Sequence, residues 1–284
     1  MNTISSPATD KGPIKIDLRA VLKSKLGKRS RFVPRFLVRR LEKLIRAEQL
    51  NRLLADNYPK TGADFCRGVL EDLDVSITAE GTSNLPAPDH RQVIIVSNHP
   101  LGALDGMAMI DYFTRYFGSP VYFIVNDLLM ALEPLNDVFV PVNKHGSQSR
   151  MAAASLEEAF SSDRPVIIFP AGLVSRLGDD GSIADLEWKK MFVNRAIATN
   201  RDIIPVFFSG ENSKSFYKLA RRRKKLGLKF NIEMLCLPRE VFRCKGKSFE
   251  LHIGPLIPVR ELSGGKEAAN TALTIRRKVY NLAR

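Results

Sequence analysis

A histidine and an aspartate six positions apart are the residues of this chain best suited to chemistry. His99 follows a run of four aliphatic residues, 93–96, and Asp105 stands at the start of a helical pattern. An aspartate that accepts a hydrogen bond from one imidazole nitrogen fixes the tautomer and leaves the other nitrogen available as a base. The pair could therefore remove a proton from a hydroxyl or an amine. In a purely structural alternative, His99 packs at the end of a strand and Asp105 caps the helix.

The residues around this pair indicate a buried strand, a sharp turn and a helix. Four aliphatic residues in succession are typical of a strand that is buried on both faces. Pro100 cannot continue a hydrogen-bonded strand, and Gly102 can adopt backbone angles that other residues resist. Apolar residues then recur at helical spacing over 106–117. The histidine is therefore predicted at the carboxyl end of a strand, where open α/β sheets place their ligand sites.

Further strands and helices alternate along the rest of the chain. This alternation predicts an α/β fold in which a mixed, largely parallel central sheet is flanked by helices. Two later segments, Ile232–Leu237 and Phe249–Ile253, are also predicted as strands. The other predicted strands are 75–79, 121–125, 138–142, 166–169 and 203–208, and the other predicted helices are 61–72, 149–160, 186–198, 213–226 and 267–282.

Several of these strands end in polar or glycine residues, and the carboxyl ends of parallel neighbours would meet at one pocket. Lys144 and Arg176 would supply positive charge there, and Gly172 would let the backbone approach a ligand. A base, its orienting carboxylate and hydrogen-bond donors around a carbonyl are what acyl transfer requires. A thioester is already activated, so the hydroxyl of a substrate could attack it directly. We therefore expect neither a bound cofactor nor a metal.

The formal net charge of +14 predicts an anionic partner such as a membrane surface, an acidic protein or nucleic acid. Residues 1–60 hold fifteen Lys and Arg against five Asp and Glu, and residues 214–229 hold eight basic residues and no acidic one. The basic run 221–225 could meet an acidic acyl carrier protein, anionic lipid or only solvent. Nucleic acid is disfavoured, because the sequence shows no helix-turn-helix, zinc finger or aromatic RNA-binding signature.

Residues 1–72 are predicted to form a basic helical region for membrane association, and residues 73–284 the α/β domain. A basic amphipathic helix begins at Pro34, and its apolar face could lie on a bilayer or on the core. The sequence contains no run of about 18 apolar residues, so no membrane-spanning helix is predicted. The first residues do not resemble a secretory signal. The expected location is the cytoplasm, peripheral on the inner face of a bacterial membrane.

Two blocks of sequence together resemble the lysophospholipid acyltransferase superfamily. The first runs from Ser97 to Asp105, and the second is Phe169-Pro-Ala-Gly172. The family hallmark is a His and an Asp separated by four residues, followed by a Phe-Pro-Glu-Gly block. This chain has five intervening residues, and Ala171 in place of the Glu. Both departures resemble the bacterial haemolysin-like branch that includes ornithine-lipid and glycine-lipid O-acyltransferases, as does the run Trp-Lys-Lys at 188–190.

The resemblance implies roles for individual residues. His99 would be the general base and Asp105 its partner. Asn143 and Lys144 would lie in a further family block that lines the acceptor site. Gly172 and Arg176 would belong to the block that begins at Phe169 and contacts the polar head of the acceptor. Lys189 and Lys190 lie in the first turn of a predicted helix, where positive charge is unfavourable with the helix dipole. An anionic group of the substrate, bound beside them, would offset this charge. In the alternative interpretation, the two lysines belong to a solvated turn. The predicted substrate-binding residues are Asn98, Asn143, Lys144, Gly172, Arg176, Lys189 and Lys190.

The predicted function is the transfer of a fatty acyl group from an acyl carrier protein or coenzyme A thioester to the hydroxyl of a lyso-lipid. The resemblance favours lyso-ornithine lipid or lyso-glycine lipid as acceptor. One alternative is a 1-acylglycerol-3-phosphate acyltransferase. Another is a basic protein that binds a membrane or nucleic acid without catalysis.

Overall fold

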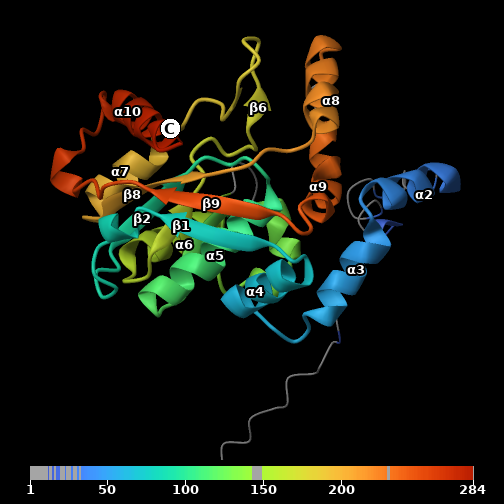
Figure 1. The fold of residues 1–284 in the computed structure, drawn as a ribbon, viewed down its shortest axis with the longest axis horizontal. Helices are drawn as coiled ribbons and strands as arrows, with labels where there is room; N and C mark the ends of the chain where they lie inside the picture. The colour runs from blue at the N-terminus through green and yellow to red at the C-terminus, as the bar shows by residue number, and fades with distance from the viewer. Residues whose placement is uncertain are drawn as a thin grey trace, which may run out of the picture.

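A seven-stranded sheet forms the centre of the computed structural model, which describes residues 33–142, 149–228 and 231–283 and a few single positions between 12 and 31. The strand order is β1-β9-β8-β2-β5-β3-β4 (Figure 1). All neighbours are parallel except β8 and β9, which are antiparallel, so the predicted mixed, largely parallel sheet is confirmed. The strands are β1 Ser76–Glu80, β2 Val93–Ser97, β3 Tyr122–Asn126, β4 Phe139–Val142, β5 Val166–Ile168, β8 Asp202–Phe208 and β9 Ser248–Ile253.

Helices cover both faces of this sheet because its central strand β2 is apolar on both sides. Val93 and Ile95 belong to one hydrophobic cluster with α4 and α5, whereas Ile94 and Val96 belong to a second cluster with α6, α7 and α10. Successive side chains of a strand point to opposite faces, which produces this division. Figure 1 shows α4 and α5 on one side of the sheet and α7 and α10 on the other. These helices are α4 Gly62–Asp72, α5 Ala103–Phe117, α6 Ser149–Ser161, α7 Met191–Ala198 and α10 Ala268–Asn281.

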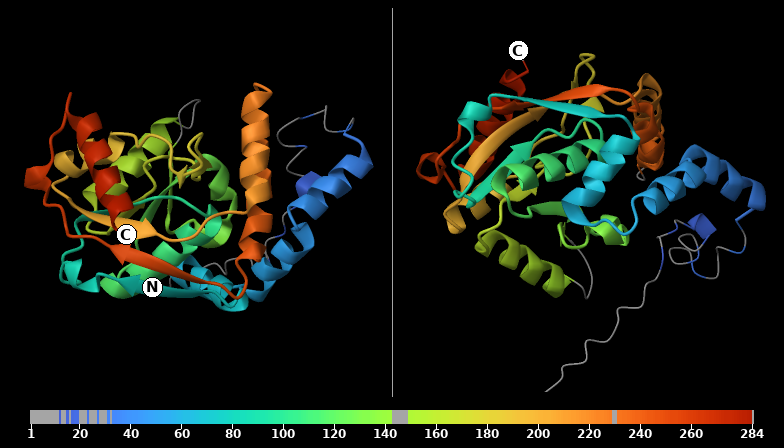
Figure 2. Two further views of the ribbon diagram at one scale, coloured as in Figure 1. Left: turned by 45° about the horizontal axis from the view of Figure 1, so that its top comes forward. Right: turned by 60° about the horizontal axis from the view of Figure 1, so that its bottom comes forward.

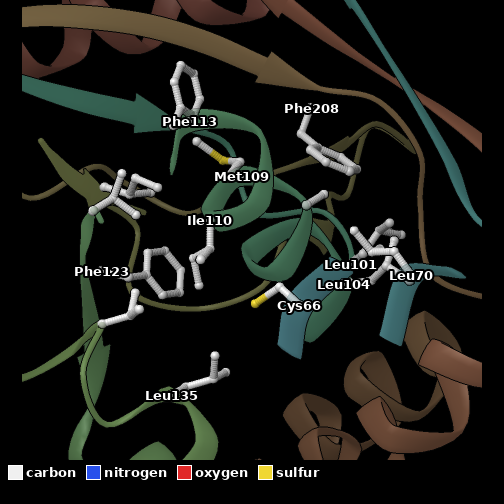
Figure 3. Packing of buried hydrophobic residues seen from close by; sticks show 14 of the residues in the cluster. Cys66, Leu70, Leu101, Leu104, Met109, Ile110, Phe113, Phe123, Leu135 and Phe208 are labelled. Carbon is white, nitrogen blue, oxygen red and sulfur yellow. The ribbon is translucent and has the colours of Figure 1, made fainter. Parts of the chain in front are cut away.

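The α4–α5 side contains the larger cluster. Figure 3 shows Cys66 and Leu70 of α4 among residues of α5, including Met109 and Ile110. Each of these four side chains is fully or almost fully buried. Helix α4 thus packs into the same core as α5, although it lies on the N-terminal side of the predicted boundary after residue 72.

Two helices, α2 (Arg35–Leu44) and α3 (Ala47–Asp56), stand where the sequence predicted one helix from Pro34. The break occurs at Arg46, whose φ of 52° is left-handed and ends α2. Leu53 and Leu54 of α3 join the larger core cluster. At the start of α2, by contrast, Phe36 is 64% exposed and Leu37 41% exposed. The apolar face is therefore divided between the core and solvent.

A small group of helices and a hairpin projects from the sheet beside α2 and α3. It contains α8 (Lys214–Lys225), a 3₁₀ helix η5 (Ile232–Cys236), α9 (Leu237–Arg243) and the hairpin of β6 (Arg176–Leu177) and β7 (Ile183–Ala184). A small cluster that includes Val174, Phe216, Tyr217 and Cys236 holds it together. In all three views of Figures 1 and 2, α8 and α2 lie at the same end of the molecule.

The strand predicted at 232–237 is wrong, because this segment forms η5 and the first residue of α9. Pro238 follows directly, and proline suits the first turn of a helix but cannot donate to a strand ladder. Glu233, inside the segment, is fully buried and pairs with Arg176 and Arg223. These ion pairs direct the segment against α8 instead of along a sheet edge.

The shorter elements connect the main layers. Among the described residues, the remaining 3₁₀ helices are η2 Thr82–Asn84, η3 Asp127–Ala131, η4 Glu133–Leu135 and η6 Val259–Glu261.

Within the described residues, no helix combines the length and the apolar character needed to cross a membrane.

Candidate active site

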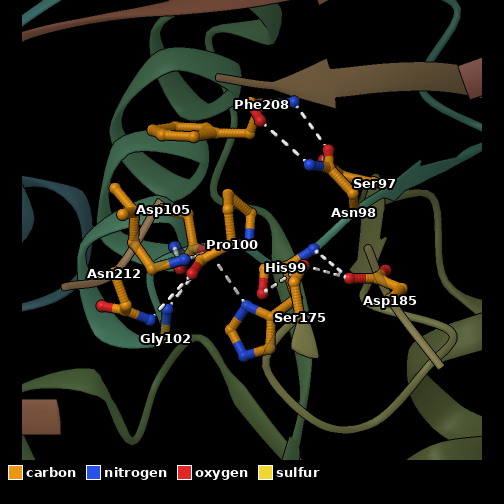
Figure 4. A network of polar contacts seen from close by, with 12 residues as sticks. Ser97, Asn98, His99, Pro100, Gly102, Asp105, Ser175, Asp185, Phe208 and Asn212 are labelled. Atoms are coloured by element: carbon orange, nitrogen blue, oxygen red, sulfur yellow. Dashed lines mark hydrogen bonds and ion pairs between the residues drawn. The ribbon is translucent and has the colours of Figure 1, made fainter. Parts of the chain in front are cut away.

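The carboxyl ends of β8, β2 and β5 meet at one edge of the sheet, because the three strands are parallel neighbours. Asn98 follows β2 directly. Its side-chain amide donates to the carbonyl of Phe208 (2.9 Å) and accepts from the N–H of Phe208 (2.7 Å), as Figure 4 shows. The amide therefore extends the β2–β8 ladder by one residue. Asn98 is buried and binds the protein backbone through both of its polar groups.

His99 and Asp105 are brought together by the turn between β2 and α5. Oδ2 of Asp105 lies 3.0 Å from Nδ1 of His99. The same oxygen accepts from the N–H groups of Leu101 (2.9 Å) and Gly102 (3.3 Å), while Oδ1 accepts from the N–H of Gly106 (2.9 Å). The carboxylate thus caps the first turn of α5 and orients the imidazole at once. This geometry fits both the structural and the catalytic interpretation of the pair, and the catalytic one stays a prediction.

Gly102 makes the longer His–Asp spacing possible. Its φ is +95°, a region that residues with a side chain rarely occupy. A Cβ at this position would lie 2.9 Å from a methyl group of Leu237, so there is also no space for one. The predicted turn at Gly102 is confirmed.

Phe169, the first residue after β5, forms one wall of the site. Its ring stacks on the imidazole of His99, with centroids 4.1 Å apart and planes 22° apart, and it meets Phe123 edge to face. His99 keeps 15% of its side chain exposed. No hydrogen bond to its Nε2 comes from any residue that the structure describes. The imidazole is thus held by Asp105 and Phe169, and its Nε2 is not engaged by a described residue.

The turn after Phe169 places Gly172 next to Lys189. Gly172 has a φ of +67°, and a Cβ there would lie 3.0 Å from Nζ of Lys189. The N–H of Lys189 donates to the carbonyl of Pro170, which holds the two segments together. The helix predicted at 186–198 begins only at Met191, so Lys189 precedes it and Lys190 is its N-cap. The sequence placed both lysines inside the helix because it gave no sign of this turn.

Arg176 is engaged within the protein. Its Nη2 lies 3.1 Å from Oε1 of Glu233, and its guanidinium lies over the ring of Phe216. Burial lowers the pKa of Arg176, although Glu233 opposes that change. Nη1 is buried and has no hydrogen-bond partner among the described residues. Arg176 is therefore held against Glu233 and Phe216, with little of its side chain open to solvent.

Asn143 and Lys144 lie outside the described residues. They follow β4, which is parallel to β3 and lies two strands from β5. The sheet thus directs the end of β4 toward the same edge as His99.

Sequence reasoning missed Asp185, which connects the segments of the site. Its Oδ1 accepts from the backbone N–H of His99 (3.1 Å) and from the hydroxyl of Ser175 (2.6 Å). Its Oδ2 accepts from the indole N–H of Trp188 (2.9 Å). Tyr280 of α10 accepts from the N–H of Asp185. No motif surrounds Asp185 in the sequence, and only its position three residues before the single tryptophan could have drawn attention to it.

A hollow of about 270 Å³ opens beside the His99 turn. Asn98, Pro100, Ser175, Glu211 and Tyr280 contribute to its lining. The imidazole of His99 does not line it, so this is not the space in which a substrate would meet Nε2. The site therefore offers an imidazole oriented by a carboxylate, the arrangement that general-base chemistry requires.

Comparison with known proteins matches a family model described as Acyltransferase to residues 20–284. The chain is 42% identical over 274 residues to the lyso-glycine lipid O-acyltransferase of Phocaeicola vulgatus, covering 96% of this chain and 97% of that protein. It is 39% identical over 274 residues to the lyso-glycine lipid O-acyltransferase of Bacteroides thetaiotaomicron, covering 96% and 100%. Among solved structures, it is similar to the 1-acyl-sn-glycerophosphate acyltransferase of Thermotoga maritima, with 18% identity, a TM-score of 0.46 and coverage of 94% and 95%.

Proposed function

The chain belongs to the acyltransferase family, and we propose that it transfers a fatty acyl group from a thioester to the hydroxyl group of lyso-glycine lipid. The names of two relatives support this acceptor. The oriented pair of His99 and Asp105 supports the reaction, because an O-acyl transfer begins with removal of a hydroxyl proton. The observation that carries the proposal is the hydrogen bond between Nδ1 of His99 and Asp105, which leaves the other ring nitrogen, Nε2, for the substrate.

In the proposed reaction, Nε2 of His99 accepts the proton of the acceptor hydroxyl while its oxygen attacks the thioester carbonyl carbon. A bond between oxygen and carbon forms, and the carbonyl oxygen becomes negatively charged. The intermediate then collapses, the carbon–sulfur bond breaks, and the thiolate leaves with the proton of the imidazolium. An ester and a free thiol result, and His99 returns to its neutral form. Acyl carrier protein and coenzyme A are the two candidate thioester donors.

Asp105 and Phe169 serve this reaction by holding the imidazole. The carboxylate of Asp105 accepts a hydrogen bond from Nδ1–H, which leaves the lone pair on Nε2, and it stabilises the imidazolium that forms. Because three backbone N–H groups also bind Asp105, the carboxylate cannot follow the histidine into another orientation. The Phe169 ring limits rotation of the imidazole from the side of β5.

Lys189 is the proposed contact for the acceptor head group. A glycine that is acylated on its amine presents a carboxylate, and a lysine beside a glycine turn offers both an ammonium group and close approach to the backbone. Lys190 lies exposed at the start of α7. Ala171, which replaces the acidic residue of the family block, is buried in the apolar cluster and offers no polar group.

The N-terminal helices supply the proposed route to lipid. The exposed Phe36 and Leu37 of α2 lie among exposed Arg35, Arg39 and Arg40. A basic helix with an open apolar edge is typical of elements that lie at a membrane interface. We propose that α2 rests on the bilayer while α3 joins it to the core.

An acceptor panel tests the proposal. Purified full-length protein is given a labelled long-chain acyl thioester, carried by acyl carrier protein or by coenzyme A, and equal amounts of lyso-glycine lipid, lyso-ornithine lipid and lysophosphatidate. The expected product is labelled glycine lipid. Product on lysophosphatidate alone would overturn the proposed acceptor, and no product on any acceptor would favour a membrane adaptor without catalysis.

A further inference from the structure

The C-terminal end of α8 is a surface that the proposed reaction does not use. Its base is fixed in the small cluster by Phe216 and Tyr217, which are buried. From Arg221 to Leu228 the chain stands away from the sheet (Figures 1 and 2), and seven of these eight residues are exposed. We call residues 221–228 the α8 tip.

The α8 tip has a fixed shape, because a hydrogen-bonded motif ends the helix. The N–H of Gly227 donates to the carbonyl of Lys224, and the N–H of Leu228 donates to the carbonyl of Arg223. This is the Schellman pattern, and Gly227 has the left-handed φ of 66° that it requires. The guanidinium of Arg223 also donates to the carbonyl of Leu228 (2.9 Å). The two leucines after the helix are therefore held in defined positions.

The charge of the α8 tip is strongly positive. Five consecutive residues, 221–225, are basic, and no acidic residue occurs in the tip. Arg223 pairs with Glu233, and Arg221 donates to the carbonyl of Gly178. Arg221 also pairs with Asp179. Among the basic residues of the tip, Arg222, Lys224 and Lys225 form no ion pair with any described residue.

Two leucines project beyond these cations. Leu226 is 74% exposed and Leu228 46% exposed. A single exposed leucine is ordinary in a folded protein. Two leucines held at the end of a helix, next to several basic side chains, form a surface that suits a partner with both apolar and anionic groups. A bilayer interface offers both, since acyl chains lie a few ångströms below anionic head groups. An acidic protein would pair with the cations and leave the leucines in water.

We propose that the α8 tip is a second membrane contact, which places Leu226 and Leu228 in the head-group region of an anionic bilayer while Arg222, Lys224 and Lys225 meet lipid phosphates. The exposed end of α2 lies at the same end of the molecule, so both elements can reach one surface (Figure 2). The inference rests on the geometry and charge of the tip, and it stands whether or not lyso-glycine lipid is the acceptor.

Vesicle sedimentation tests the charges. Full-length protein is mixed with vesicles of phosphatidylglycerol and phosphatidylcholine, or of phosphatidylcholine alone. Each cation near an anionic surface strengthens binding about fivefold, so Arg222→Gln/Lys224→Gln/Lys225→Gln is expected to weaken binding to anionic vesicles about a hundredfold. Arg277→Gln/Lys278→Gln on α10 is the matched control, because both residues are exposed on a different helix.

Tryptophan insertion tests the leucines. Leu226→Trp is expected to shift its fluorescence to shorter wavelength on anionic vesicles and to be quenched by lipids brominated near the head group. Leu273→Trp on α10 replaces an exposed leucine away from the tip and is expected to show neither change. The native Trp188 is buried and gives the same background in both variants.

Unchanged vesicle binding by the triple variant, or no fluorescence change at residue 226, would overturn the proposal. Loss of binding to acyl carrier protein with vesicle binding intact would overturn it in favour of an acidic protein partner. Thermal unfolding verifies that each variant folds. Acyl transfer in detergent micelles is measured separately, and a failure there would count against the proposed reaction and not against the α8 tip.

Discussion

Oδ2 of Asp105 lies 3.0 Å from Nδ1 of His99 and also accepts hydrogen bonds from two backbone N–H groups of the turn between them. One oxygen thus connects the start of α5 to the imidazole. A helix cap and a catalytic orienter are usually offered as competing explanations for an aspartate at such a position. Here the cap fixes the carboxylate, and the fixed carboxylate orients the imidazole.

Substitutions of Asp105 are expected to separate the two roles. Asp105→Asn keeps an acceptor oxygen but loses the negative charge, so kcat/KM is expected to fall about 10²- to 10⁴-fold, the range for a positioned base. Asp105→Ala also leaves three backbone N–H groups without their acceptor and is expected to lose about 1–3 kcal/mol of unfolding free energy. Urea denaturation and initial rates measure the two effects. Equal rates for wild type and Asp105→Asn would contradict the orienting role.

The stacked ring of Phe169 is expected to act on kcat more than on KM. Phe169→Leu removes the contact with His99 but keeps an apolar side chain. The expected loss in kcat is roughly two- to twelvefold, the equivalent of the 0.5–1.5 kcal/mol of an aromatic pair. Phe123→Leu is the control, because Phe123 touches Phe169 but does not stack on the histidine. If both variants lose kcat equally, the stack on His99 has no special role.

Gly172 is expected to affect the binding of the acceptor through Lys189. Gly172→Ala places a methyl group 3.0 Å from Nζ of Lys189 and forces alanine into a left-handed conformation, at about 1–2 kcal/mol of stability. The displaced lysine is expected to raise KM for the acceptor. Gly118→Ala is the matched control, since Gly118 has a φ of +57° but open space around its Cβ position. It is expected to lose stability with KM unchanged, and an equal rise in KM would show that backbone strain alone is the cause.

Asp185 is expected to influence stability in a pH-dependent way. Burial raises its pKa above the usual value, while hydrogen bonds from Ser175, Trp188 and His99 oppose that change. The folded chain therefore keeps this proton to a higher pH than the unfolded chain. Its contribution to stability falls as the pH rises from about 4 through the folded pKa.

Asp185→Asn removes this titration. The difference in unfolding free energy between wild type and variant is expected to become less favourable to wild type as the pH rises through that range, as measured by urea denaturation at several pH values. Asp180 gives a control of opposite sign, because hydrogen bonds from Ser182 lower its pKa. A difference that grows with pH for Asp185→Asn would contradict the raised pKa.

The sequence was sufficient for the sheet and for the central pair. The aliphatic run 93–96 is typical of a strand buried on both faces, and a parallel sheet then places His99 and Phe169 at one edge. The turn at Gly102 was also predictable, because Pro100 ends the strand and glycine adopts the left-handed φ found there.

Contacts between distant segments could not be predicted in the same way. Asp185 acts through Ser175, Trp188 and a backbone group of His99, and no local pattern reports such contacts. The segment 232–236 has the apolar content of a strand, but the buried Glu233 and its arginine partners determine its conformation. The break at Arg46 shows no glycine or proline, so the apolar spacing alone predicted one continuous helix.

Whether His99 is the general base is tested most directly with two histidine variants, in acyl transfer from a labelled long-chain thioester to lyso-glycine lipid. His99→Ala removes the proposed base. His90→Ala removes a histidine that also pairs with an aspartate, Asp202, but at the opposite end of the sheet. If His99 is the general base, kcat/KM is expected to fall at least about 10²-fold for His99→Ala and to be unchanged for His90→Ala. Undiminished transfer by His99→Ala would contradict this role.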